Sequence, residues 1–67
     1  MKFKIEHEQE EDSRWLAEVL ELPGVLAYGK DIEKAIARAQ ALALRVVADR
    51  LEHSESVSLL TISFAAI

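Results

Sequence analysis

The chain has no cysteine among its 67 residues, and this absence removes two common supports of a small domain. Without cysteine there are no disulfides and none of the usual thiolate zinc sites. A domain this short buries only roughly 60% of its unfolded surface, so it needs another source of stability. Subunit association can supply it, and a hydrophobic content of 51% favours that solution. We therefore expect a homo-oligomer, either a dimer or a tetramer.

Long apolar runs are also absent. No segment approaches the roughly 20 apolar residues that span a bilayer. The first residues, Met1 to Lys4, lead into a charged stretch and not into the apolar core of a signal peptide. We expect a cytoplasmic protein with no membrane partner. The sequence further predicts a single domain over residues 1–67, with no linker, internal repeat or separate DNA-binding domain.

The basic excess that nucleic-acid binding requires is lacking as well. The net charge is −4, and all of it arises in residues 1–21, which hold seven acids and three bases. Residues 22–67 hold five of each. An acidic surface repels a phosphate backbone, so we expect no direct binding of nucleic acid.

The pattern of the first third of the chain predicts two strands. Residues 2–8 alternate, with Phe3 and Ile5 on one side and charged residues on the other, which is typical of a half-buried strand. Residues 9–13 are polar and acidic and predict a hairpin turn. Residues 14–20 then alternate again, and we expect them to run antiparallel to the first strand.

Two turns are predicted after the second strand. Pro23 removes a ladder donor and Gly24 supplies the positive φ that many tight turns need. Residues 25–28 predict a short third strand, and Gly29 is expected to turn the chain after it. Asp31 is expected to cap a following helix by accepting hydrogen bonds from its free backbone amides.

Residues 32–52 predict a long helix. Its apolar stripe, at three- and four-residue spacing, consists of Ile32, Ala35, Ile36, Ala39, Leu42, Ala43 and Val46. The stripe is widened by Leu44, Val47 and Leu51, which we expect at a subunit contact. At 1.5 Å per residue the helix is roughly 30 Å long and outreaches the strands. Residues 57–64 predict the last strand.

This order, β-β-β-α-β, predicts an α+β fold. A meander makes the first and third strands run the same way, and a right-handed helical crossover brings the fourth parallel to them. The fourth strand can lie beside the first or beside the third. We predict a mixed four-stranded sheet of order 3-2-1-4, because a central first strand suits Phe3 and Ile5. One long helix would cover one face of this sheet.

The candidate site residues are acidic: Glu6, Glu8, Glu10, Glu11 and Asp12. A solvated turn is the simplest interpretation, and alternation separates Glu6 and Glu8 from His7, which disfavours a metal site. The second interpretation is a surface for a basic protein, with Trp15 as an aromatic anchor. His7 and His53 have no nucleophile beside them, and no glycine-rich phosphate loop is present. We therefore expect no catalysis, no metal and no cofactor.

A longer pattern spans residues 15–35. Its elements are Trp15-x-Ala17, Glu21-Leu22-Pro23-Gly24 and Ala27-x-Gly29-x-Asp31-x-Glu33-x-Ala35. This pattern resembles the N-terminal domain of HicB-type antitoxins and their short stand-alone relatives, in which an aromatic-x-small strand precedes D-L-P-G-C and then G-D-T-x-E-E-A. The chain departs from the family pattern at Glu21, Val25, Lys30, Asp31 and Lys34.

The resemblance implies a partial ribonuclease-H-like fold and a module that binds and neutralises a small basic RNA-cleaving toxin of the HicA type. Operator binding and nuclease activity are not carried over. The family's operator binding resides in a further domain, and ribonuclease H chemistry needs clustered carboxylates for two metals. The competing hypothesis is an orphan self-assembling domain with another regulatory or ligand-binding role, which the broad apolar face of the helix motivates.

Overall fold

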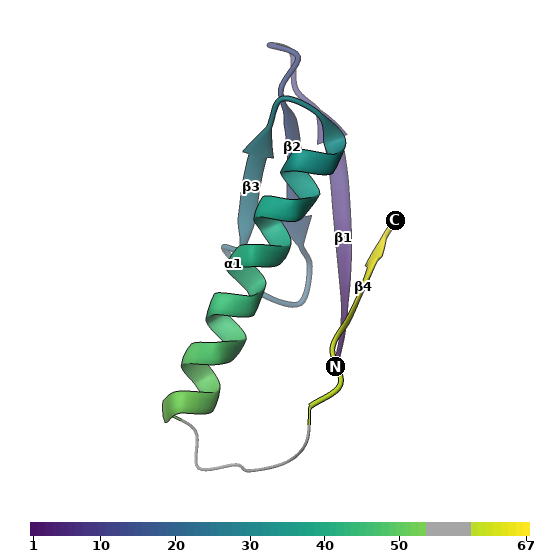
Figure 1. Ribbon diagram of the computed structural model, residues 1–67. Coiled ribbons are helices and arrows are strands. Elements are labelled where there is room, and N and C mark those ends of the chain that lie inside the picture. Colours follow the sequence, from purple (N-terminus) through teal and green to yellow (C-terminus); the bar gives the residue numbers. More distant parts are fainter. Residues whose placement is uncertain (54–59) are drawn as a thin grey trace.

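A computed structural model describes residues 1–53 and 60–67, which form four strands and one helix in two layers (Figure 1). The elements are β1 (Lys2–Gln9), β2 (Trp15–Val19), β3 (Leu26–Gly29), α1 (Ile32–His53) and β4 (Ser63–Ala66). The sheet has the order β3-β2-β1-β4. β1 pairs antiparallel with β2 and parallel with β4, and β2 pairs antiparallel with β3. The predicted α+β topology is confirmed.

The core lies between α1 and the sheet. It consists of Phe3, Ile5, Ala17, Val19, Leu22, Val25, Ala35, Ala39, Ala43 and Val47. The helix contributes mainly alanines at a spacing of four residues, and these small side chains let its backbone come close to the strands. It packs on β2 and β3 and has few contacts with β1. In Figure 1 the helix accordingly crosses β2 and β3, while β4 stands to one side.

The turns around β3 fix where the helix begins. Gly24 has a φ of 86°, as its turn position predicts. The Lys34 backbone N–H donates to Asp31 Oδ1 at 2.8 Å, so the predicted cap is confirmed. Gly29, predicted as a turn residue, instead ends β3 and is buried. A Cβ on Gly29 would lie 2.4 Å from the Ala35 backbone nitrogen, so glycine is required there by the closeness of the helix.

The helix extends past the sheet. It is 22 residues long, and its C-terminal half continues beyond the ends of β2 and β3 (Figure 1). On this half, Leu44 is 46% exposed and Leu51 is 47% exposed. Val47, expected beside them at a subunit contact, is only 4% exposed and belongs to the core. That expectation was wrong because the buried stripe Ala35-Ala39-Ala43 continues at the same spacing to Val47.

The last strand is shorter and later than predicted. The sequence indicates residues 57–64, whereas β4 is Ser63–Ala66 and residues 60–62 lie outside the strand. Residues 57–59 lie outside the described residues. The boundary follows from register, because Lys2, where β1 begins, pairs with Ser63. Alternation within residues 57–64 carries no information about where the partner strand begins.

Candidate functional site

The sheet face away from α1 carries a row of exposed charged residues. Alternation along β1 turns Lys2, Lys4, Glu6 and Glu8 to this face, all of them exposed. Glu18 on β2 lies directly opposite Glu6, and Leu16 lies opposite Glu8. We call Glu6, Glu8 and Glu18 the acidic sheet face. Glu18 was not among the predicted site residues, because its position depends on the register of the β1–β2 hairpin.

The pairing of Glu6 with Glu18 is electrostatically unfavourable. Like charges directly opposite on neighbouring strands repel each other. Among the described residues, neither carboxylate forms an ion pair. The depression that these residues line with Glu8 and Leu16 measures only about 20 Å³. That volume is close to the space of a single water molecule, so these residues form an open surface and not a pocket.

Apolar side chains border the acidic sheet face on the side of β3. Leu16 lies opposite Tyr28, and Glu18 lies opposite Leu26. Leu26 is 39% exposed and Tyr28 is 36% exposed. The Arg14 guanidinium stacks on the Tyr28 ring at 4.4 Å from its centroid. The acidic sheet face is therefore bordered by a strip of exposed apolar side chains.

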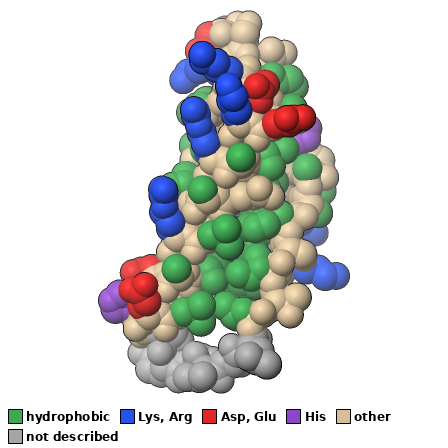
Figure 2. Space-filling view, in the orientation of Figure 1, with side chains coloured by type: hydrophobic (Ala, Val, Ile, Leu, Met, Phe, Trp, Pro, Cys, Tyr) green, Lys and Arg blue, Asp and Glu red, His purple; other side chains and the backbone are tan. Residues whose placement is uncertain are grey.

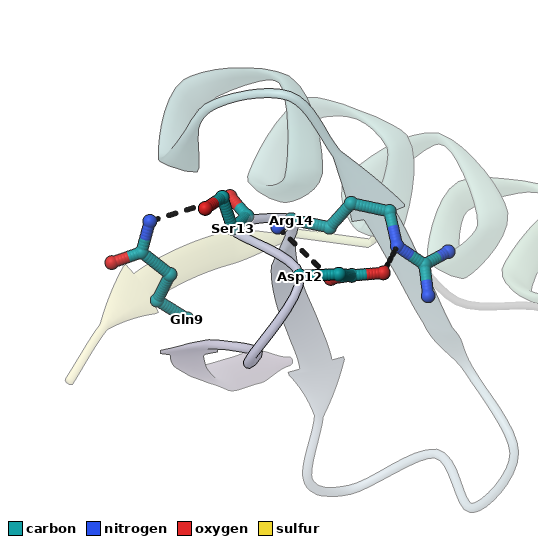
Figure 3. Close-up of polar contacts among 4 residues, drawn as sticks. All are labelled: Gln9, Asp12, Ser13 and Arg14. Atoms are coloured by element: carbon teal, nitrogen blue, oxygen red, sulfur yellow. Dashed lines mark hydrogen bonds and ion pairs between the residues drawn. The ribbon is translucent and has the colours of Figure 1, made fainter.

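The hairpin tip uses one of its acids internally (Figure 3). Asp12 Oδ1 accepts a hydrogen bond from the Arg14 backbone N–H at 3.2 Å, and Asp12 Oδ2 accepts one from Arg14 Nε at 2.6 Å. Gln9 Nε2 donates to the Ser13 carbonyl at 3.3 Å, and Ser13 has a φ of 74°. Asp12 thus stabilises the turn, which leaves Glu10 and Glu11 as the tip carboxylates without such an ion pair among the described residues.

The pairing with Arg14 gives the hairpin a pH dependence. The pKa of the Asp12 carboxyl lies below its ordinary value, first because the Arg14 backbone N–H donates to it and then because the Arg14 side chain does. A carboxyl group whose pKa is lowered by folding stabilises the folded state at pH values above its unfolded-state pKa. This stabilisation is lost as the pH falls below about 4. We expect Arg14→Gln to raise the Asp12 pKa in an NMR titration. Lys2→Gln is the control, and an equal rise there would contradict the assignment.

Trp15 lies on the opposite side of the sheet from the acidic sheet face. It alternates with the buried Ala17 and Val19 and is half-buried itself. Its ring lies 6.2 Å from that of His7, centroid to centroid. The predicted partner-binding set therefore divides into three places: Glu6 and Glu8 on the open face, the acids of the hairpin tip, and Trp15 on the helix side.

An apolar groove lies between α1 and the turn that precedes β3. It has a volume of about 390 Å³ and is lined by Gly24, Val25, Leu42, Arg45, Val46 and Asp49. Apolar side chains are also exposed between the C-terminal half of α1 and the chain that enters β4 (Figure 2). His53 Nδ1 lies 2.9 Å from the Asp49 carbonyl oxygen at the helix end.

Neither a metal cluster nor a membrane-spanning helix is found in the described residues. Within 1–53 and 60–67, no three His, Asp or Glu side chains gather as metal ligands would. Over the same residues, no helix has the length and apolarity needed to cross a bilayer. Comparisons with protein-family models, with curated proteins and with solved structures gave no match. The functional argument therefore depends on the surface of this chain.

Proposed function

We propose that this chain is a non-catalytic binding module of the HicB antitoxin type, which neutralises a small basic RNA-cleaving toxin of the HicA type in the cytoplasm. The observation that carries the proposal is the acidic sheet face, where Glu6 and Glu18 oppose each other without an ion pair among the described residues. The resemblance of residues 15–35 to HicB-type domains supplies the class of partner.

A basic partner relieves the repulsion between Glu6 and Glu18. Its lysines or arginines would lie between carboxylates that otherwise destabilise each other. Complementary charge also raises the association rate and selects against acidic competitors. The exposed Leu26 and Tyr28 offer apolar contact area next to the charges, which an interface needs at its centre.

Neutralisation follows from competition for the same surface. An RNA-cleaving protein binds its substrate through cations that contact phosphates. A module whose carboxylates bind those cations excludes the RNA, and it needs no catalytic group of its own. The acids of the hairpin tip, Glu10 and Glu11, extend the negative surface beyond the sheet.

Glu18→Lys tests this proposal with opposite effects on folding and on binding. Lysine at position 18 would face Glu6 as an attractive pair, so we expect the fold to be at least as stable as before. Binding to a small basic RNA-cleaving protein encoded beside this chain should weaken roughly tenfold to a hundredfold. Calorimetry measures the affinity, and an RNA-cleavage assay measures the loss of neutralisation.

Glu52→Lys is the matched control, because it makes the same change of charge on the exposed side of α1. Its affinity for the toxin should stay close to that of the unchanged chain. The proposal is abandoned if both variants weaken binding equally. It is also abandoned if the chain neither co-purifies with such a protein nor blocks its RNA cleavage.

The second candidate function is an orphan self-assembling domain with another regulatory or ligand-binding role. The exposed Leu44 and Leu51, together with the groove of about 390 Å³ beside α1, favour this alternative. A stable dimer or tetramer from a locus without an adjacent toxin gene would support it over the antitoxin role.

A further inference from the structure

The two edges of the sheet are treated differently by the chain. At the β3 edge, Arg38 Nη1 donates to the Tyr28 carbonyl at 2.8 Å, so a side chain from α1 occupies an acceptor on that strand. At the β4 edge, no side chain of the described residues is bound to the backbone. Natural proteins protect free edges because unpaired N–H and C=O groups recruit further strands.

The backbone of β4 has its free groups at known positions. The N–H groups of Ser63 and Ile67 donate to the Met1 and Ile5 carbonyls, at 3.0 and 2.9 Å. Because successive residues of a strand alternate, Phe64 and Ala66 direct their N–H and C=O groups to the outer edge. The Phe64 ring lies 5.5 Å from the Phe3 ring, centroid to centroid, which anchors β4 on β1.

The sequence of this segment lacks the charged residues and the proline that often protect an edge. Residues 56–67 contain no charged residue, no proline and no glycine. Lysines, prolines and bulges are the usual means of preventing edge pairing. Ile67 is 57% exposed and Leu60 is 38% exposed, so apolar area accompanies the free backbone groups.

We propose that β4 pairs antiparallel with β4 of a second copy of this chain, with Ala65 on the two-fold axis. In this register Phe64 of one copy lies opposite Ala66 of the other, and the two residues exchange both of their backbone hydrogen bonds. By symmetry, Ala66 of the first copy does the same with Phe64 of the second. The two Ala65 residues form the close pair, with Cα atoms about 4.5 Å apart. Their methyl groups fit this spacing, and a large phenylalanine lies beside a small alanine on the helix side.

Three features favour a second copy over another partner. An uncharged strand meets no like charge when it pairs with itself. The nearest lysine on this face, Lys4 on β1, would lie three strand spacings or about 14 Å from its equivalent, beyond the Debye length of about 10 Å at 0.1 M salt. Because the contact is isologous and uses the β4 edge of both copies, pairing at β4 closes as a dimer and does not propagate into a fibre.

The test is a charge swap at the two-fold axis. The unchanged chain should sediment at twice 7.5 kDa. Ala65 is exposed in a single chain, so lysine or glutamate there meets no steric obstacle, although lysine would lie opposite Lys4. Ala65→Lys alone and Ala65→Glu alone should each sediment as single chains, because like charges then meet across the axis. An equimolar mixture of the two should recover the doubled mass.

Ala37→Lys on the exposed side of α1 is the matched control and should stay dimeric. A single-chain mass for the unchanged protein overturns the proposal, and so does a doubled mass for Ala65→Lys alone or a mixture that stays dissociated. If both Ala65 variants unfold, hydrogen exchange on the unchanged chain decides. Protection of the Phe64 and Ala66 amides that grows with concentration supports the pairing, and free exchange at all concentrations overturns it.

This dimer is independent of toxin binding. Ala65→Lys keeps Glu6, Glu8 and Glu18, so a dissociated chain should still bind the basic partner. Loss of the dimer with retained binding would separate the two proposals. Pairing of the two β4 strands joins the two sheets edge to edge into one eight-stranded sheet, and the two-fold axis is perpendicular to that sheet. Both acidic sheet faces therefore lie on the same side of it.

Discussion

Gly29→Ala is expected to destabilise the fold by about 3 kcal/mol. A Cβ at this position would lie 2.4 Å from the Ala35 backbone nitrogen, 2.9 Å from the Lys34 carbonyl carbon and 3.0 Å from the Ala35 Cα. All three are backbone atoms of the first helical turn, so no rotamer change relieves the overlap. The helix must move away from β3, and it loses contact with the core beneath its alanines.

Urea unfolding followed by circular dichroism measures this loss. A 67-residue domain has a free energy of unfolding of roughly 3–10 kcal/mol, so the expected loss removes between about a third and all of it. Gly24→Ala is the control, because a Cβ added at Gly24 would meet no atom within 4 Å, although the residue has a φ of 86°. It should cost only about 1–2 kcal/mol, from the left-handed backbone alone. Equal losses for the two variants would show that close packing at Gly29 is unimportant.

Ile5→Ala is expected to have an effect of similar size, about 2–5 kcal/mol. Ile5 is fully buried on β1, a central strand, and Val19 opposite it on β2 is fully buried as well. Truncating the side chain removes its transfer free energy and leaves a cavity. The surrounding strands are hydrogen-bonded on both sides of β1 and therefore cannot collapse into that space.

Leu26→Ala is the matched control for Ile5→Ala, since it deletes the same number of carbons from a residue that is 39% exposed. We expect it to cost less than about 1 kcal/mol. Both variants should shift the urea midpoint without changing the slope of the transition, because each alters stability and not the surface exposed on unfolding. A Leu26→Ala loss as large as that of Ile5→Ala would contradict the assigned faces of the sheet.

The sheet topology was predictable because it depends on local patterns and on chain parity. Period two in residues 2–8 indicates which side of β1 is buried, and Phe3 and Ile5 are on that side. The Pro23-Gly24 turn and the Asp31 cap mark the ends of β2 and the start of α1. The handedness of the helical crossover then leaves few sheet orders to consider.

Features that depend on register or on close approach were not predictable in this way. The start of β4 is set by pairing of Lys2 with Ser63, which no pattern within residues 57–64 encodes. Gly29 is glycine because of a helix backbone that approaches from six positions later. The burial of Val47 depends on the rotation of α1 about its axis, and an apolar arc this wide leaves that rotation undetermined.

The candidate site shows the same division. Alternation placed Glu6 and Glu8 on the outer face of β1, and they lie there. The position of Glu18 opposite Glu6 depends on the cross-strand register. The hydrogen bond from Arg14 to Asp12 depends on the geometry of the turn. Once Gln9 is paired with Trp15, antiparallel counting brings Glu18 opposite Glu6. The length of the hairpin turn is therefore the signal in the sequence that could have identified Glu18.

The parallel pairing of β1 with β4 has a consequence for the order of folding. Phe3 and Phe64 are partners although 61 positions separate them, whereas β1 pairs with β2, and β2 with β3, each the next strand in the chain. Closing so long a loop is entropically costly and slow. We therefore expect β1 to spend the early life of the folding chain as an edge strand, with its outer backbone groups open until the C-terminal segment arrives.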